Sequence, residues 1–179
     1  ERVLDLSKPQ VRDFIKSELV RLIETYGFDM LRLDNNNYNV YEGGFNDRNG
    51  KMENTHWRNV EALYGLFDDL RAQYPGLLFE NCAGGGGRTD LGILSRFDTT
   101  WVSDWHKLPR SVKILNGMSL ALPPEYINRM VGAAAEAASQ GSLETLMHTV
   151  ILGHPTLSGI APRIEEINPA AIETIRKYI

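Results

Sequence analysis

The chain has 179 residues, of which 42% are hydrophobic and 23% are charged, a composition typical of a folded globular domain and unlike that of a disordered chain. Its net charge is -4 and its Lys and Arg residues are scattered, which argues against nucleic acid and anionic membrane surfaces as partners. The single cysteine, Cys82, excludes an intrachain disulfide and a zinc site built from several cysteines, and no apolar run approaches the roughly 20 residues that span a bilayer.

The first half of the chain alternates between predicted helices and predicted strands. Apolar residues that recur every three or four positions, with Ser7 as N-cap and Gly27 as the stop, predict the first helix. The second helix is expected to bury Trp57 with its other apolar residues. In chain order the elements are a helix over 9–26, a strand over 28–34, a polar loop over 35–55, a helix over 56–73 and a strand over 77–82.

The second half continues this alternation. Its predicted elements are a brief helix over 89–96, a strand over 99–103, a helix over 108–116, a strand over 118–122, an alanine-rich helix over 126–138 and a helix over 169–179. The segment 143–152 is ambiguous, although its end at Gly153-His154-Pro155 resembles the exit from a strand. About five strands alternate with helices, which predicts a parallel α/β sheet with crossover helices. Because a closed eight-stranded barrel needs about 250 residues, we expect a (β/α)8 TIM barrel of which this chain supplies about the last five strands.

Polar residues follow three of the predicted strands. Asp34 and Asp104 end two of them, and a glycine-rich run, Glu-Asn-Cys-Ala-Gly-Gly-Gly-Gly-Arg over 80–88, ends the strand between them. Active sites of parallel barrels lie at these strand ends, and alternate strands contribute to the same layer, so the two carboxylates are expected to converge. Two carboxylates that flank a bond are the minimum equipment for glycoside hydrolysis; a separation of about 5 to 5.5 Å implies retention of configuration, and about 6.5 to 9.5 Å implies inversion.

The neighbours of the two aspartates suggest different roles for them. Arg32, two residues before Asp34 on the same strand face, would keep Asp34 ionised as a nucleophile, whereas Trp101 and Trp105 would desolvate Asp104 as an acid. Taken singly, an aspartate after a strand is more often a helix cap or a turn former than a catalyst. The glycine run lacks the lysine of a phosphate loop, the four histidines show no paired ligand spacing, and neither a metal nor an organic cofactor is predicted.

These motifs, in this order, resemble those of the α-galactosidases of glycoside hydrolase family 36. In that family a Lys-Trp-Asp strand end bears the nucleophile, an Asn-Cys-x-x-Gly-Gly-Gly-Arg loop lines the sugar subsite, and a Trp-x-Ser-Asp strand end bears the acid/base. The stretches of this chain that carry the resemblance are Leu31-Arg32-Leu33-Asp34, the run 80–88, Trp101-Val102-Ser103-Asp104, Ala121-Leu122-Pro123-Pro124 and Leu152-Gly153-His154. The resemblance implies a retaining α-glycosidase with Asp34 as nucleophile and Asp104 as general acid/base.

The same resemblance, together with the aromatic platform that Trp105 offers, points to residues that bind the sugar. They are Arg32, Asn81, Cys82, Gly84, Gly85, Arg88 and Trp105. Residues 1–179 would then form part of the catalytic barrel domain, with its first strands and the flanking β domains absent. A carbohydrate substrate is the expected partner, while oligomeric state and cellular compartment are left open.

Departures from the family pattern leave the identity of the sugar open. Arg32 replaces the usual lysine of the family and Leu33 replaces its tryptophan. Trp105-His106-Lys107 follows the acid/base, where the family often has a small or polar residue. The polar loop, with Tyr38, Tyr41, Glu42 and Asp47, would add contacts to a substituted or oligomeric substrate. Two alternative functions remain at this point: a metal-dependent barrel hydrolase with Asp34, Asp104 and histidines as ligands, and a barrel that binds carbohydrate without cleaving it.

Overall fold

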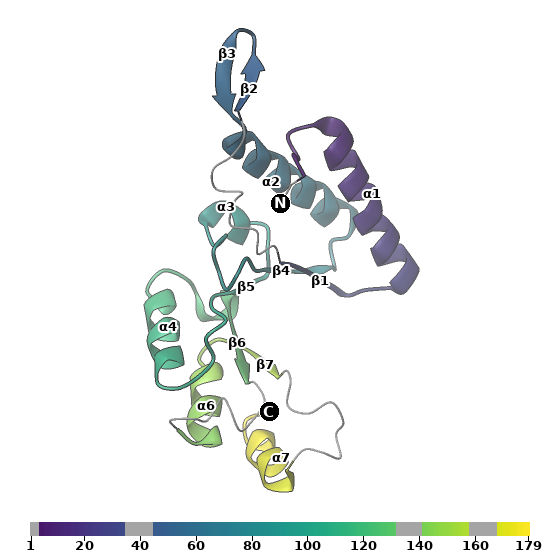
Figure 1. Cartoon of the computed structure of the whole chain (residues 1–179). Coiled ribbons are helices and arrows are strands. Elements are labelled where there is room, and N and C mark those ends of the chain that lie inside the picture. Colours follow the sequence, from purple (N-terminus) through teal and green to yellow (C-terminus); the bar gives the residue numbers. More distant parts are fainter. Residues whose placement is uncertain (1–3, 35–44, 132–140, 158–167) are drawn as a thin grey trace. The chain divides into compact units, whose positions relative to one another are not determined.

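The computed structural model describes residues 4–34, 45–131, 141–157 and 168–179. Apart from one β-hairpin, its helices and strands alternate along the chain (Figure 1). Five strands form one sheet in the order β1-β4-β5-β6-β7, and β2 and β3 form a separate hairpin. The α/β class and the number of sheet strands agree with the sequence prediction. The chain divides into two compact units, residues 1–80 with 90–97 and residues 81–89 with 98–179, and each is described by itself.

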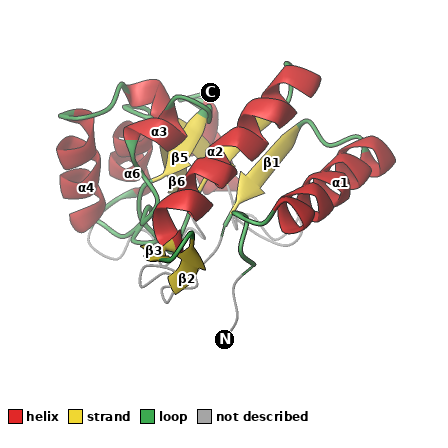
Figure 2. Ribbon diagram, turned by 90° about the horizontal axis from the view of Figure 1, so that it is seen from above, coloured by secondary structure: helices red, strands yellow, loops and turns green. Residues whose placement is uncertain are grey.

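The first unit contains two long helices that lie side by side (Figures 1 and 2). Its elements are α1 (Pro9–Tyr26), β1 (Met30–Leu33), β2 (Phe45–Arg48), β3 (Lys51–Asn54), α2 (Thr55–Gln73), β4 (Leu78–Asn81) and α3 (Leu91–Leu94). Its core contains three aromatic rings among aliphatic side chains: the ring of Phe67 lies 5.1 Å from that of Phe79 and 4.5 Å from that of Phe97, measured between centroids. This core joins α2 to β4 and to the segment after α3, and α1 adds Ile23 to it.

The ends of the two long helices only partly follow the prediction. Gly27 ends α1 as expected, with φ 63° and its N–H bound to Ile23. The N-cap is Lys8 rather than Ser7, because the helix begins at Pro9 and the Ser7 hydroxyl donates to Asp5 instead. Trp57 is 64% exposed and not buried, since it lies in the first turn of α2, before the apolar stripe of that helix reaches the core.

Part of the predicted polar loop is a β-hairpin. Strands β2 and β3 pair antiparallel, and the turn between them has positive φ at Asn49 and Gly50. This Asn-Gly pair is the usual sequence of a two-residue hairpin turn. The loop prediction is therefore wrong over 45–54, while Tyr38, Tyr41 and Glu42 lie outside the described residues.

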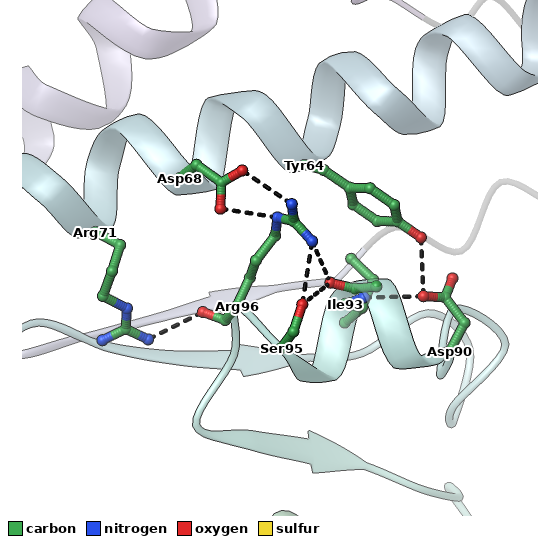
Figure 3. Close-up of polar contacts among 8 residues, drawn as sticks. Tyr64, Asp68, Arg71, Asp90, Ile93, Ser95 and Arg96 are labelled. Carbon is green, nitrogen blue, oxygen red and sulfur yellow. Dashed lines mark hydrogen bonds and ion pairs between the residues drawn. The ribbon is translucent and has the colours of Figure 1, made fainter.

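A polar cluster attaches the short helix α3 to α2 (Figure 3). Asp90 caps α3 by accepting from the backbone N–H of Ile93 at 2.8 Å, and it also accepts from the hydroxyl of Tyr64 at 2.8 Å. Arg96 pairs with Asp68 of α2 at 2.9 Å. The predicted brief helix is therefore present and is held at both of its ends by side chains of α2.

The second unit contains the last three strands of the sheet. Its elements are β5 (Thr99–Trp101), α4 (Arg110–Ser119), a 3-10 turn η2 (Pro124–Tyr126), β6 (Ile127–Val131), α6 (Leu143–Val150), β7 (His154–Leu157) and α7 (Pro169–Arg176). Both strand pairs are parallel, with Trp101 opposite Asn128 and Asn128 opposite His154. Helices α4 and α6 both contact β6, and α7 contacts α6.

Three predictions for the second unit are wrong. Residues 118–122 finish α4 in a helical turn, because Leu122 donates to the carbonyl of Met118 at 2.9 Å. The strand is β6, where a helix was predicted over 126–138; residues 132–140 lie outside the described part of the chain. The ambiguous segment is helix α6, and the strand after it begins at His154 rather than ending there. No helix within the described residues is long and apolar enough to cross a membrane.

Candidate active-site residues in the two units

Asp34 lies directly after β1 in the first unit, as predicted. The Nη2 atom of Arg32 is 3.5 Å from its Oδ2 atom, and about a third of each side chain is exposed. The strand geometry explains this contact, because residues two positions apart in a strand point to the same face. The predicted pairing of Arg32 with Asp34 is therefore present, and it places a positive charge beside a carboxylate that solvent can reach.

Glu80 is a third member of this group and was not predicted. It lies in β4, its side chain is 3% exposed, and its Oε1 atom is 2.9 Å from Nη1 of Arg32. Arg32 thus bridges a buried carboxylate and the exposed carboxylate of Asp34. A charged residue within an apolar strand requires a buried partner. That requirement is the signal in the sequence that could have identified Glu80.

The polar residues of the glycine-rich run hold the run together in the second unit. Asn81 is fully buried and donates through Nδ2 to the hydroxyl of Thr100 at 3.0 Å. Arg88 donates to the carbonyl oxygen of Cys82 at 2.8 Å, and the Cys82 side chain is buried. These contacts of the three predicted sugar-binding residues fix the loop itself.

The glycines of the run lie against the backbone that bears Asp104. Gly84, Gly85 and Gly86 all have positive φ, a conformation that other residues rarely adopt. A Cβ atom on Gly85 would lie 2.6 Å from the backbone N and 3.1 Å from Cγ of Asp104. The absence of a side chain therefore allows close packing on Asp104, and two motifs that are separate in the sequence meet here.

Asp104 is exposed and is held by a hydrogen bond from Trp101. The strand β5 ends at Trp101, three residues before Asp104, and the Nε1 atom of Trp101 donates to Oδ1 of Asp104 at 2.9 Å. The Trp101 ring lies 4.8 Å from the ring of His106. Trp101 thus contacts Asp104 through its polar N–H group rather than as the apolar wall that the sequence suggested.

Trp105 is 45% exposed and carries a cation over its ring. The guanidinium carbon of Arg110 lies 4.9 Å from the ring centroid, and the indole N–H donates to the carbonyl of Lys107 at 3.1 Å. One face of the predicted sugar platform is therefore covered by Arg110.

Arg129 of β6 also reaches the Asp104 segment and was not predicted. Its Nη2 atom donates to the carbonyl of Trp105 at 2.8 Å and its Nη1 atom to the carbonyl of Ser103 at 3.5 Å. Burial lowers the pKa of Arg129 to about 10. Sequence reasoning missed it because the segment was assigned to a helix, on which an arginine would normally face solvent.

Asp34 belongs to the first unit and Asp104 to the second, so their convergence stays a prediction. Within residues 4–34, 45–131, 141–157 and 168–179, no three His, Cys, Asp or Glu side chains are grouped so that they could hold a metal ion. Each aspartate has its own set of polar neighbours in its own unit. The arrangement supplies two exposed carboxylates, one beside a cation and one beside an indole N–H donor.

Comparison with known proteins gives a consistent family assignment. The Melibiase family model matches residues 1–176. Alpha-galactosidase 2 of Pediococcus pentosaceus is 33% identical over 135 residues, which cover 75% of this chain and 19% of that protein. Alpha-galactosidase 2 of Hypocrea jecorina is 26% identical over 189 residues, which cover 96% of this chain and 24% of that protein.

Solved structures agree with this assignment. A variant of the family 36 α-galactosidase AgaA from Geobacillus stearothermophilus, in complex with 1-deoxygalactonojirimycin, matches 98% of this chain and 24% of its own with a TM-score of 0.85 and 25% identity. The chain thus spans about a fifth to a quarter of the length of the relatives it matches.

Proposed function

Because this chain belongs to the Melibiase family, the α-galactosidases of glycoside hydrolase family 36, and shares their barrel fold, we propose that the full-length protein hydrolyses α-galactosides with retention of configuration. The names of the relatives support galactose as the sugar and hydrolysis of an O-glycosyl bond as the reaction. Residues 1–179 are proposed to be part of the catalytic barrel domain. The expected partner is a carbohydrate substrate.

The observation that carries the mechanism is the contrast between the surroundings of the two aspartates. Asp34 lies beside the guanidinium of Arg32, and Asp104 is held by Trp101 against the glycine run. A nucleophile must face the anomeric carbon, where the ion pair with Arg32 can hold its carboxylate, whereas a general acid/base must be placed accurately at the glycosidic oxygen. We therefore assign Asp34 as nucleophile and Asp104 as general acid/base.

The proposed reaction proceeds in two displacements. Asp34 attacks the anomeric carbon, the bond to the leaving group breaks, and the leaving oxygen takes the proton of Asp104. A water molecule then gives a proton to Asp104 and attacks the anomeric carbon, which breaks the bond to Asp34 and restores both groups. Two inversions at one carbon give net retention, and neither step needs a metal ion.

The proposed sugar-binding residues divide into two kinds by their exposure. Arg32, Arg88, Gly84, Gly85 and Trp105 are at least partly accessible, so they are proposed to contact the sugar directly. Asn81 and Cys82 are buried and are proposed to act by holding the loop in shape.

The test is a screen of the full-length protein against aryl α- and β-glycosides, with the anomer of the first product followed by proton NMR. Release of α-galactose from an α-galactoside is expected. An inverted product, activity that a chelator removes, or sugar binding without turnover would each contradict the proposal.

Variants of the two aspartates test their roles in the same assay. Asp34→Ala is expected to lower kcat by about 10⁴-fold or more on every substrate. Asp104→Ala is expected to cost about 10²- to 10⁴-fold on aryl galactosides with poor leaving groups, and little in the first step with good ones, which leave without a proton. Asp13→Ala, at an exposed aspartate of α1, is the matched control with unchanged kinetics. Equal losses on both substrate types in Asp104→Ala would contradict the assignment.

A further inference from the structure

We propose that Arg129 is a positioning residue for the acid/base Asp104, holding its backbone through the two peptide carbonyls that flank it. This inference rests on the proposed glycosidase function. It concerns β6, a strand that contributes none of the residues assigned to the reaction above. Arg129 acts through the segment 103–105 and is not proposed to touch the substrate.

The burial of Arg129 is the first observation. The residue is 1% exposed, and no acidic side chain pairs with it among the residues that the structure describes. Burying a charged group is costly unless polar groups replace its water. An apolar side chain would fill the same place in β6 at lower cost, so the contacts that Arg129 makes require a reason beyond packing.

Those contacts are the second observation, because both go to one short segment. The guanidinium donates to the carbonyl of Trp105 at 2.8 Å and to the carbonyl of Ser103 at 3.5 Å. These carbonyls belong to the residues immediately before and after Asp104. A planar guanidinium presents several N–H groups in a fixed fork and can bind two acceptors together, which a lysine ammonium does less well.

The third observation is that other contacts constrain the same residue from different directions. Trp101 donates to the Asp104 side chain at 2.9 Å, and Gly85 packs so closely on the Asp104 backbone N that a Cβ atom would lie 2.6 Å away. Arg129 adds constraints on the two carbonyls. Three different parts of the second unit thus constrain Asp104: Trp101 holds its side chain, Gly85 packs on its amide, and Arg129 binds the carbonyls of the residues before and after it.

Loss of Arg129 should therefore impair proton transfer and not nucleophilic attack. A shift of about 1 Å in a catalytic group costs about 100-fold in rate. The loss should appear with leaving groups that need a proton and should be small for those that do not. An added anionic nucleophile needs no general base, so azide should restore the second displacement in the variant.

The experiment uses the full-length protein, phenyl α-galactoside as the poor substrate and dinitrophenyl α-galactoside as the good one. Arg129→Met is expected to lower kcat/KM about 100-fold for the phenyl substrate and less than about threefold for the dinitrophenyl substrate. Azide is expected to accelerate its turnover of the dinitrophenyl substrate and to yield α-galactosyl azide. Arg129→Lys, which keeps the charge but not the fork, is expected to show a smaller loss of about 10-fold on the phenyl substrate.

Arg71 provides a matched control. It also donates to two backbone carbonyls, those of Leu77 at 2.8 Å and Arg96 at 3.0 Å, but neither flanks a residue assigned to the reaction. Arg71→Met should lower thermal stability without changing the ratio of kcat/KM for the two substrates.

The outcomes separate this inference from the proposed function. Equal losses on both substrates in Arg129→Met, or no azide product, would overturn the inference while leaving the glycosidase proposal intact. If Arg129→Met does not fold, the ratio of kcat/KM for the two substrates is measured in Arg129→Lys instead. A ratio equal to that of the unsubstituted protein would overturn the inference. Absence of α-galactosidase activity in the unsubstituted protein would overturn the proposed function, and this inference with it.

Discussion

Replacing Gly85 with alanine should damage the reaction more than the fold. Gly85 has φ 76°, a left-handed conformation that costs a non-glycine residue about 1 to 2 kcal/mol. The new Cβ atom would also lie 2.6 Å from the backbone N of Asp104, where 3.4 Å is the ordinary limit of contact. Because the obstacle is backbone and not the tip of a flexible side chain, the loop or the Asp104 segment must move by about 0.8 Å.

A displacement of this size has a calculable effect on the rate. If a 1 Å misplacement costs about 100-fold, we expect Gly85→Ala to lower kcat/KM by about 30- to 100-fold, equivalent to about 2 to 2.7 kcal/mol in the transition state. The loss should be larger for phenyl α-galactoside than for dinitrophenyl α-galactoside, because Asp104 donates the proton to the leaving oxygen. Steady-state kinetics of the full-length protein measure both values.

Gly27→Ala separates backbone strain from displacement. Gly27 has φ 63°, and a Cβ atom there would meet nothing within 4 Å. We expect this variant to lose about 1 kcal/mol of stability, seen as a lower thermal unfolding temperature, and to keep its kcat/KM. If Gly85→Ala also kept kcat/KM within about twofold while losing similar stability, the reasoning that the glycine run positions Asp104 would be refuted.

Three further predictions concern the first unit. Glu80→Ala leaves Arg32 without its 2.9 Å partner, so it should lower the free energy of unfolding by about 2 kcal/mol and also reduce kcat. Phe79→Ala removes a ring that is 0% exposed and should cost about 3 to 5 kcal/mol by thermal unfolding. Burial, and after it the hydrogen bond to Asp90, raises the pKa of Tyr64 to about 12. Tyr64 therefore stabilises the fold fully below pH 10, and this stabilisation is lost progressively as the pH rises to 12. Tyr64→Phe should remove this pH dependence of the free energy of unfolding, measured in urea.

Each of these three predictions has a control variant or a result that would contradict it. Glu18→Ala breaks the exposed 2.8 Å pair with Arg21 and should leave the free energy of unfolding unchanged. If Glu80→Ala changed the free energy of unfolding as little as Glu18→Ala, burial of Glu80 would not strengthen its ion pair. Leu91→Ala alters a residue that is 79% exposed and should cost far less than Phe79→Ala. A slope between pH 10 and 12 that is the same with and without the Tyr64 hydroxyl would show that another group causes it.

The helices of the first unit were predictable because their signals are local. Pro9 at the first turn of α1 and Gly27 at its end are read from adjacent residues, and the apolar spacing of α2 is complete within the helix. The prediction for β6 failed for the opposite reason. Asn128 and Arg129 are polar yet buried, and the carbonyls that Arg129 binds lie in a segment that local spacing does not include. The alanine-rich residues that follow β6 extended the helix prediction backwards over the strand.

The candidate site shows the same division between local and distant information. Asp34 and Arg32 were predicted to pair because two residues of one strand share a face, and the structure brings them to 3.5 Å. Glu80 joins them from another strand, and its burial depends on which strand lies next to β1. No pattern within the residues around Glu80 specifies that partner.

The sequence by itself determined the family and the α/β class, because motif order, periodicity and helix punctuation are all properties of the chain read in one dimension. Only the tertiary structure decided that Gly85 packs on Asp104, that Trp101 donates to it, and that Arg129 holds the carbonyls beside it. These contacts join segments up to 26 residues apart, and close packing selects them only after the strands have paired.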